Sequence, residues 1–313
     1  MAFQKINIDY AGLDTNEIVR DFFNQTSLAT DFGARVVPGM KSKAVFHTIQ
    51  ETLTLHPYQC VNTEVDDIVL TQKGIDLCSV TLNAQFCRDA IIQTYREKYL
   101  GQGVWNESIM NDQMLSQMIL EMILERGMQL SDEALLTGGT YGGTNLCTGL
   151  LALFEDDADV IRYTVNPAQI NPANIITIFN EVEDLLPVEL QNNKTFPVKF
   201  AVSADIGRNY RRYLQQERLF NAQTAYVPGA KVPMLYGDMI EVVQLNNLPP
   251  STIFATYPRN IILVFDDMPA ESAIRVVDKS QFSAFDNNIE IAMPFRQGVN
   301  YGFGDKIVYG TTA

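Results

Sequence analysis

The sequence predicts an α+β fold whose helices are collected in the middle of the chain. Three observations support this prediction. Residues 36–83 alternate apolar and polar side chains as strands do, whereas residues 108–136 place apolar side chains three and four positions apart, as an amphipathic helix does. From Tyr226 onward, short apolar runs alternate with Pro, Gly and Asn, a pattern of short strands joined by turns. Strands and helices that segregate along a chain are typical of the α+β class.

Composition and charge narrow the class of protein. The 313 residues are 46% hydrophobic and 19% charged, which is enough apolar material to bury a core in one or two domains. A formal net charge of −14 repels phosphate, so we expect no sequence-independent grip on nucleic acid over most of the surface. Purely apolar runs such as Ile261–Phe265 are short, so we expect neither a signal peptide nor a membrane span.

The four cysteines, Cys60, Cys78, Cys87 and Cys147, lie far apart and form no CxxC pair. This distribution favours the reduced thiols of a cytoplasmic protein over a secreted disulfide framework. We therefore expect all four to be small core residues.

The first part of the chain is predicted to be a polar arm followed by a long β-hairpin. The arm contains a short helical pattern at Asp14–Phe23. Two alternating segments, Ala44–Leu55 and Ile68–Leu82, predict the hairpin, with a turn expected at Lys73–Gly74. A two-stranded hairpin is marginal by itself, so we expect it to lie on a neighbour.

The amphipathic pattern of residues 108–136 predicts a helix roughly 40 Å long, at about 1.5 Å per residue. Gly138–Gly139 end it, because glycine adopts the left-handed conformation there, and a loop to Asn145 follows. A second helix is predicted from the Asn171 cap and Pro172 to Leu185. Later expected elements are a strand at Val198–Val202, a helix at Asp205–Gln216, and strands at Ile240–Leu245, Ile253–Ala255, Ile261–Phe265, Ala273–Val277 and Ile289–Ala292.

Motifs for catalysis and metal binding are weak. His47 and His56 are the only histidines, and His56 with Cys60 supplies at most half of a zinc site, which needs four ligands. The sequence contains no GxSxG or HExxH motif. We therefore expect no metal, no cofactor and no catalytic residue.

Two further clusters have structural interpretations. The glycines Gly138, Gly139, Gly142 and Gly143 follow a helix and lack a Lys-Ser/Thr ending, unlike a phosphate-binding loop. The acidic run Glu155–Asp159 lacks the spacing and central glycine of a calcium loop, so we expect a solvated turn. The acidic residues Glu181, Glu183, Asp184 and Glu189 are expected on the solvated face of the second helix.

The order of these parts resembles the Hong Kong 97-type coat protein fold of tailed bacteriophages, over nearly the whole chain. That fold has an N-terminal arm, an extended β-hairpin loop, a long spine helix, a peripheral domain and an axial domain. The resembling segments are Leu82–Ala90 (LNAQFCRDA), Ser131–Leu150 (SDEALLTGGTYGGTNLCTGL), Asn171–Leu185, Val198–Leu214 (VKFAVSADIGRNYRRYL), Tyr236–Val243, Asn260–Val277 and Phe295–Tyr309 (FRQGVNYGFGDKIVY).

The resemblance implies a division of the chain into domains. The parts are an arm at 1–36, an extended loop at 37–83, a peripheral domain at 84–205 and 278–313 with its spine helix at 108–136, and an axial domain at 206–277. Some relatives join subunits covalently through a lysine of the extended loop and an asparagine. Lys41, Lys43 and Lys73 lie in that region, but no asparagine or glutamate can be matched, so this chemistry is not carried over.

The function that the resemblance implies is structural and not enzymatic. It is that of a major capsid protein which self-assembles through pentamers and hexamers into the icosahedral head that encloses double-stranded phage DNA. The implied protein partners are other copies of the chain and a portal protein, with scaffolding and decoration proteins as open possibilities. Packaged DNA is expected to contact the inner face weakly, and no membrane is expected as a partner. The implied location is the virion capsid, and the host cytoplasm during assembly. Since no leading segment for proteolytic removal is visible, scaffolding is expected from a separate protein or from none.

Two alternatives stay open at this point. An encapsulin-type nanocompartment shell has the same fold and holds a cargo enzyme instead of DNA. A soluble α+β hydrolase or binding domain, using carboxylates such as Asp266 and Asp267, belongs to a different class and predicts a small oligomer with a ligand pocket.

Overall fold

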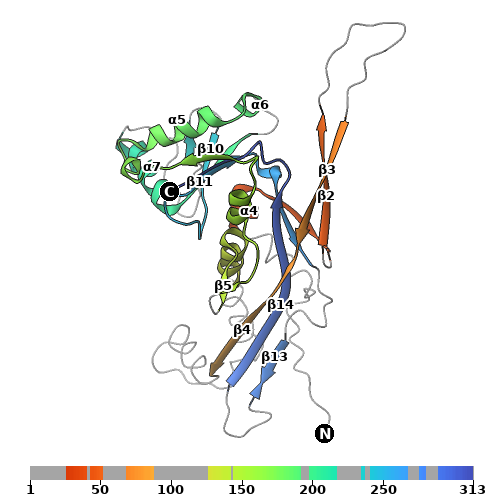
Figure 1. The fold of residues 1–313 in the computed structure, drawn as a ribbon. Helices are drawn as coiled ribbons and strands as arrows, with labels where there is room; N and C mark the ends of the chain where they lie inside the picture. Colours follow the sequence, from red (N-terminus) through yellow and green to blue (C-terminus); the bar gives the residue numbers. More distant parts are fainter. Residues whose placement is uncertain are drawn as a thin grey trace, which may run out of the picture.

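The computed structural model of the protein describes residues 26–40, 43–51, 68–87, 126–141, 144–191, 197–216, 234–236, 240–266, 275–279 and 288–312. Two large sheets form the body, and a two-stranded hairpin projects from it (Figure 1). The prediction of a mixed α+β protein is confirmed.

The first sheet has five strands in the order β1–β12–β14–β13, and β4 also pairs with β14. Only β1 is parallel to its neighbour, β12. The strands are β1 (Arg35–Pro38), β4 (Cys78–Cys87), β12 (Ile261–Phe265), β13 (Arg275–Asp278) and β14 (Asn288–Tyr301).

The second sheet has six strands in the order β7–β15–β11–β8–β10–β9. Some of its strands come before residue 205 in the sequence and others after it. Residue 205 is the boundary that we expect between the peripheral and axial domains. Its strands are β7 (Ile161–Thr164), β8 (Lys199–Val202), β9 (Met234–Tyr236), β10 (Ile240–Gln244), β11 (Ile253–Thr256) and β15 (Val308–Thr311).

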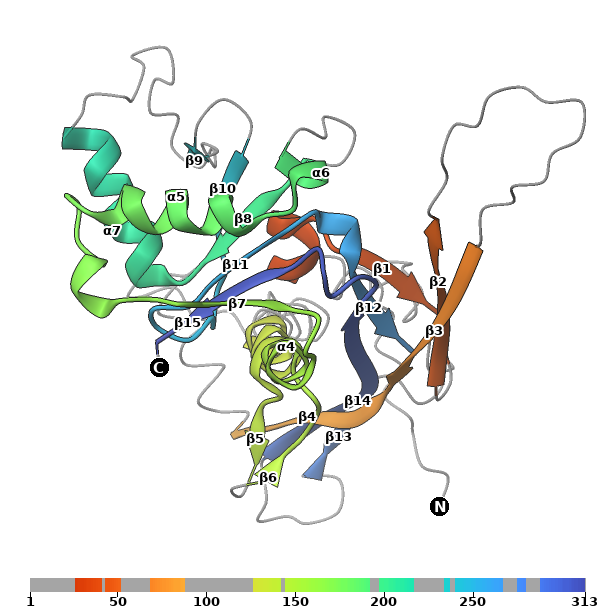
Figure 2. The same ribbon diagram turned by 45° about the horizontal axis from the view of Figure 1, so that its top comes forward.

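Helices cover both faces of this second sheet (Figure 2). Residues 126–137 are helical and pack, together with α4, on one face of the sheet. Helices α5 and α7 pack on the opposite face. The helices are α4 (Leu150–Asp156), α5 (Ile175–Leu185), α6 (Val188–Gln191) and α7 (Ala204–Gln216); short elements are η1 (Leu28–Phe32), η4 (Pro167–Gln169), η5 (Pro258–Asn260), β5 (Thr140–Tyr141) and β6 (Thr144–Asn145).

Successive residues of the sheet strands enter two different cores. On β8, Phe200 and Val202 face the core of α5 and α7, whereas Ala201 faces the core of α4. Phe254 on β11 likewise lies in the α4 core, between two neighbours that face the other way. Because both faces are covered, these strands have almost unbroken apolar sequences instead of the alternation of a half-exposed strand.

Several sequence expectations hold. The strands expected at Val198–Val202 and Ile261–Phe265 are β8 and β12, and the helix expected at Asp205–Gln216 is α7. Gly138 and Gly139 adopt φ values of 93° and 58°, the left-handed conformation that ends the helix before them. The expected long helix is described only from residue 126, and the arm helix at Asp14–Phe23 lies outside the described residues.

Two local expectations are wrong, and one expected strand is longer than the sequence pattern indicated. Lys73 and Gly74 form no turn but lie inside β3, opposite Phe46 and Val45 of β2. Asn171 does not cap α5. Its Oδ1 atom accepts the backbone N–H groups of Ala173 and Asn174 in a turn, and α5 begins after this turn, at Ile175. The strand expected at Ile289–Ala292 is one end of β14, which has 14 residues.

Candidate functional site

The projecting hairpin consists of β2 (Lys43–Glu51) and β3 (Ile68–Asp76) in antiparallel pairing. After Leu77 the chain continues directly into β4, so β3 and β4 are nearly one long strand. The first half of this strand pairs with β2 and the second half pairs with β14. The hairpin is therefore anchored to the body where the strand changes partners.

A close crossing of backbones fixes the anchor point. A Cβ atom on Gly298 of β14 would lie 2.9 Å from the carbonyl oxygen of Asp76 and 2.9 Å from Cγ2 of Ile75. No side chain larger than hydrogen fits at that distance without a shift of the backbone. Next to it, Asn300 Nδ2 donates a hydrogen bond to the carbonyl oxygen of Gly74 at 2.9 Å.

Apolar side chains seal the base of the hairpin. Ala44 and Ile75 of the hairpin pack with Ile262 and Val264 of β12 in a small buried cluster. The hairpin residue Val45 points away from this cluster and is 42% exposed. The hairpin thus buries one face at its base, while its outward face there meets solvent.

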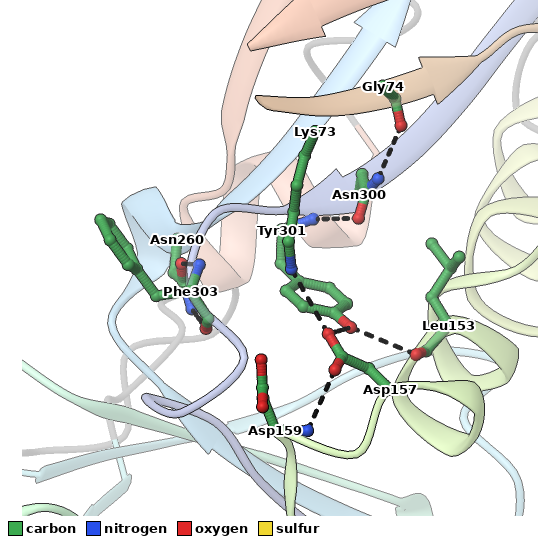
Figure 3. A network of polar contacts seen from close by, with 9 residues as sticks. All are labelled: Lys73, Gly74, Leu153, Asp157, Asp159, Asn260, Asn300, Tyr301 and Phe303. Atoms are coloured by element: carbon green, nitrogen blue, oxygen red, sulfur yellow. Dashed lines mark hydrogen bonds and ion pairs between the residues drawn. The ribbon is translucent and has the colours of Figure 1, made fainter. Parts of the chain in front are cut away.

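An ion pair inside a hydrogen-bond network ties the hairpin to α4 (Figure 3). Lys73 Nζ lies 3.3 Å from Asp157 Oδ2 and 4.2 Å from the centre of the Tyr301 ring. Tyr301 donates its hydroxyl to the same carboxylate oxygen at 2.6 Å, and the Asp159 backbone N–H donates to Asp157 Oδ1 at 3.0 Å. The network joins β3, β14 and the residues after α4 at one point.

Electrostatics stabilise the charged form of the carboxylate in this network. Burial by itself raises the pKa of Asp157, but the hydrogen bonds from Tyr301 and the Asp159 N–H, with the charge of Lys73, outweigh burial and hold the pKa below its usual value. Burial and the bond to Asp157 raise the pKa of Tyr301. The Asp157 carboxylate is therefore charged and the Tyr301 phenol neutral at neutral pH, as a structural contact requires. The acidic run is accordingly not a wholly solvated turn.

A disulfide forms a second link beside the hairpin. Cys78, the first residue of β4, is bonded to Cys147 in the loop after the helix at 126–137, with 5.5 Å between the Cα atoms. The expectation of reduced thiols is wrong for these two residues, because the fold brings together positions that are 69 residues apart. Cys87 is free but exposed, not a core residue, and Cys60 lies outside the described residues.

Buried polar side chains join the helix at 126–137 to its surroundings. Ser131 donates its hydroxyl to Gln297 Oε1 at 2.6 Å, and Gln297 is completely buried. Asp132 is 4% exposed and accepts the backbone N–H of Ser27 at 2.9 Å, at the start of η1. Burial raises the pKa of Asp132, and the bonds from Ser27 offset part of this effect.

The other residues singled out from the sequence do not converge on one site. His47 lies on β2, whereas His56, Lys41 and Asp267 lie outside the described residues. Asp266 is buried and pairs with Arg296 at 3.4 Å. Among the described residues, no group of three or more His, Cys, Asp or Glu side chains is arranged to hold a metal ion.

Two acidic residues of the second helix also differ from the expected solvated face. Glu181 and Glu183 are half-buried and accept hydrogen bonds from the hydroxyls of Tyr163 and Tyr236. Asp184 and Glu189 are exposed as expected. The tyrosine partners come from β7 and β9, and their distance along the chain hides these contacts from sequence reasoning.

Solved structures of similar shape identify the fold. A chain of the satellite phage P4 procapsid, in a structure that includes the size determination (Sid) protein, is 11% identical, with a TM-score of 0.54 over 93% of this chain and 98% of that one. A chain of Gordonia phage Cozz is 11% identical, with a TM-score of 0.55 over 92% and 87%. A chain from the capsid of the empty GTA particle is 11% identical, with a TM-score of 0.53 over 100% and 94%.

The chain has the fold of phage capsid proteins. The likeness spans nearly the full length of the matched chains. Comparisons of the sequence with known protein families and with curated proteins find no match. Within the part of the chain that the structure describes, no helix has the length and apolar character needed to cross a membrane.

Proposed function

We propose that this chain is a major capsid protein that assembles with copies of itself into a closed shell. One observation carries the proposal: the capsid fold matches from end to end, covering 93% of this chain and 98% of the P4 procapsid chain. The fold has few known uses, so function follows from it more directly than is usual.

The anchored hairpin supports the same proposal. Its base packs against β12 and β14, and a two-stranded hairpin gains stability when its faces are covered. A neighbouring copy is the natural cover, because identical chains in head-to-tail contact close into rings. In a ring, each copy lays its hairpin on the next copy and is covered by the hairpin of the copy before it.

The finer proposal is a Hong Kong 97-type arrangement. Pentamers and hexamers build the icosahedral head around double-stranded DNA in the virion, after assembly in the host cytoplasm. The arm, the extended loop and the spine helix link neighbouring copies, and the peripheral and axial domains follow the boundaries expected from the sequence. A portal protein and any scaffolding or decoration proteins complete the particle, and the chain acts as structure, not as an enzyme.

Electron microscopy of the purified full-length chain, with its mass in solution, tests the proposal. Closed shells, or rings of five and six, are the expected result. A uniform monomer or dimer across salt and protein concentrations would overturn it and favour the soluble enzyme or binding domain. Shells that hold an enzyme cargo and no DNA when isolated from the native source would indicate an encapsulin-type compartment instead.

A truncation tests the contribution of the arm to closure. Leu28 and Phe32 are completely buried in the main core, so the deletion must end at residue 25 to leave the fold intact. The variant lacking residues 1–25 is expected to stay folded, by circular dichroism, and to form no closed shells. Normal shells from this variant would show that the arm does not link copies.

A further inference from the structure

The outer face of α7 carries a cluster of arginines. Arg208, Arg211 and Arg212 are exposed, while Ile206 and Tyr210 on the opposite face are buried in the core. Arg208 and Arg212 are four positions apart and therefore lie one above the other on the helix surface. Three positive charges within five residues stand out in a chain whose net charge is −14.

Two of these arginines have no partner among the described residues. Arg211 bonds to the Gln244 side chain and to the carbonyl oxygen of Gly207. Arg208 and Arg212 form no ion pair or hydrogen bond within the part of the chain that the structure describes. Exposed arginines suit an interface, because their planar groups bind carboxylates through two hydrogen bonds and their stems pack on apolar surface.

The corner between α5 and α6 has the complementary character. Leu185 is 38% exposed and Val188 is 71% exposed, and these apolar residues lie next to Asp184 and Glu189 in the sequence. Asp184 is exposed, and the Glu189 side chain is 81% exposed although it forms an ion pair of 3.9 Å with Lys306. Exposed apolar side chains flanked by exposed carboxylates are a surface that an arginine face can cover.

The two surfaces lie at opposite ends of the same layer. α7 lies at one end of α5 and α6 at the other, in both Figure 1 and Figure 2. One molecule therefore cannot bring its own arginine face onto its own acidic corner. A second copy can, and the resulting contact joins two different surfaces, which is the type of contact that generates rings.

We propose that the α7 arginine face, Arg208 and Arg212, binds the α5–α6 corner of the next copy around a ring. This inference rests on the proposed shell function and names the surfaces that hold neighbours together within a ring. The carboxylates of Asp184 and Glu189 receive the guanidinium groups, and the arginine stems cover Leu185 and Val188. Electrostatic attraction between the faces offsets the repulsion between two acidic chains.

Charge reversal on one face at a time tests the contact. The variant R208E/R212E and the variant D184R/E189R each place like charges opposite one another. Both are expected to fold as the wild type does, because the four side chains are exposed, and to raise the protein concentration needed for assembly by at least about tenfold. The combined four-substitution variant restores both the net charge and the attraction, so it is expected to assemble at the wild-type concentration.

A mixing experiment adds a sharper readout. In an equal mixture of the two double variants, every attractive contact joins one kind of chain to the other, so the chains must alternate around a ring. Alternation closes a ring of six but not a ring of five. We therefore expect six-membered rings in the mixture and neither five-membered rings nor closed icosahedral shells by electron microscopy.

The outcomes separate this inference from the shell proposal. If the wild type does not assemble, the shell proposal itself fails. If the wild type assembles and the double variants assemble equally well, only the interface is overturned. If R208E/R212E forms normal shells that retain less DNA, the arginine face contacts nucleic acid and not a neighbouring copy, which also overturns the interface.

Discussion

Lys73 on β3 and Asp157 after α4 form an ion pair of 3.3 Å that ties the projecting hairpin to the body. A second ion pair at the base of the same hairpin, Lys43 with Asp76, has the same separation of 3.3 Å. Their exposure differs: the side chains of the first pair are 29% and 25% exposed, and those of the second are 60% and 84% exposed. The two pairs therefore compare a half-buried ion pair inside a hydrogen-bond network with an exposed ion pair of the same length.

Replacing Lys73 by methionine is expected to lower the free energy of unfolding by about 1 kcal/mol, because a half-buried, hydrogen-bonded carboxylate loses its cation. The matched variant K43M is expected to change it by less than about 0.5 kcal/mol, since water screens that exposed pair. Urea unfolding of unassembled subunits measures both. Hydrogen exchange should also become faster in β2 and β3 for K73M alone. Equal effects of the two variants would show that the Lys73 network does not hold the hairpin.

The glycine crossing gives a second prediction. G298A is expected to cost about 1–3 kcal/mol, because the new methyl group would lie 2.9 Å from a backbone oxygen of β3 that cannot move independently. The matched variant G207A lies within α7, where alanine favours helix, and its methyl group would lie 3.0 Å from Oε1 and 3.4 Å from Cβ and Cγ of Gln244, side-chain atoms that can shift more easily than a backbone oxygen. We expect G207A to leave stability unchanged or slightly raised. Thermal unfolding compares the two variants, and an unchanged midpoint for G298A would contradict the close crossing.

Local patterns in the sequence predicted most elements of the fold. β8, β12 and α7 each have a continuous pattern of their own, so their positions could be found without knowing their neighbours. The hairpin turn was misplaced because Lys73–Gly74 resembles a turn, although Gly74 lies in a strand opposite Val45. Glycine there lies beside Lys43, to whose Cε atom a Cβ would come within 2.8 Å. Pairing with a partner strand overrode the local signal.

The candidate site was harder to predict, because its contacts join distant parts of the chain. Lys73 and Asp157 are 84 positions apart, and Tyr301 lies 144 positions beyond Asp157. Each residue alone has an ordinary interpretation as a surface charge or a core aromatic. The resemblance to capsid proteins predicted where the hairpin projects, but only the folded chain brings these three side chains together. The disulfide was missed for the same reason.

The Cys78–Cys147 bond predicts a large effect of reductant. Closing a loop across 69 residues is expected to stabilise the subunit by about 2–4 kcal/mol through the entropy of the unfolded chain. Urea unfolding with and without reductant should show this difference in the wild type and not in C78A/C147A. C87A is the matched control and should keep the full effect, because Cys87 is a free thiol.

Thiol titration in denaturant checks that bond independently. The chain has four cysteines, and with one disulfide two thiols per chain should react when no reductant is present. Four reactive thiols per chain, in protein purified without reductant, would show that Cys78 and Cys147 are not bonded in the isolated protein.

The two buried or half-buried aspartates predict opposite responses to pH. Burial raises the pKa of Asp132, so the folded state holds a proton that the unfolded state has lost, and stability from this group falls as pH rises from 3.8 through the folded pKa. The pKa of Asp157 is lowered, so its contribution is present above 3.8 and is lost as pH falls through the folded pKa. The negative charge of Asp31 also raises the pKa of Asp132.

Urea unfolding of D132N and D157N across acidic pH measures these responses, because asparagine does not titrate. The free energy of unfolding of the wild type relative to D132N should decrease as pH rises above 3.8. The free energy of unfolding of the wild type relative to D157N should increase as pH rises toward 3.8, because the Asp157 carboxylate becomes charged and binds Lys73 and Tyr301. The same sign for both variants would mean that burial does not dominate at Asp132. In that case the Ser27 bonds would hold the buried carboxylate in its charged form, and η1 would stay capped at low pH.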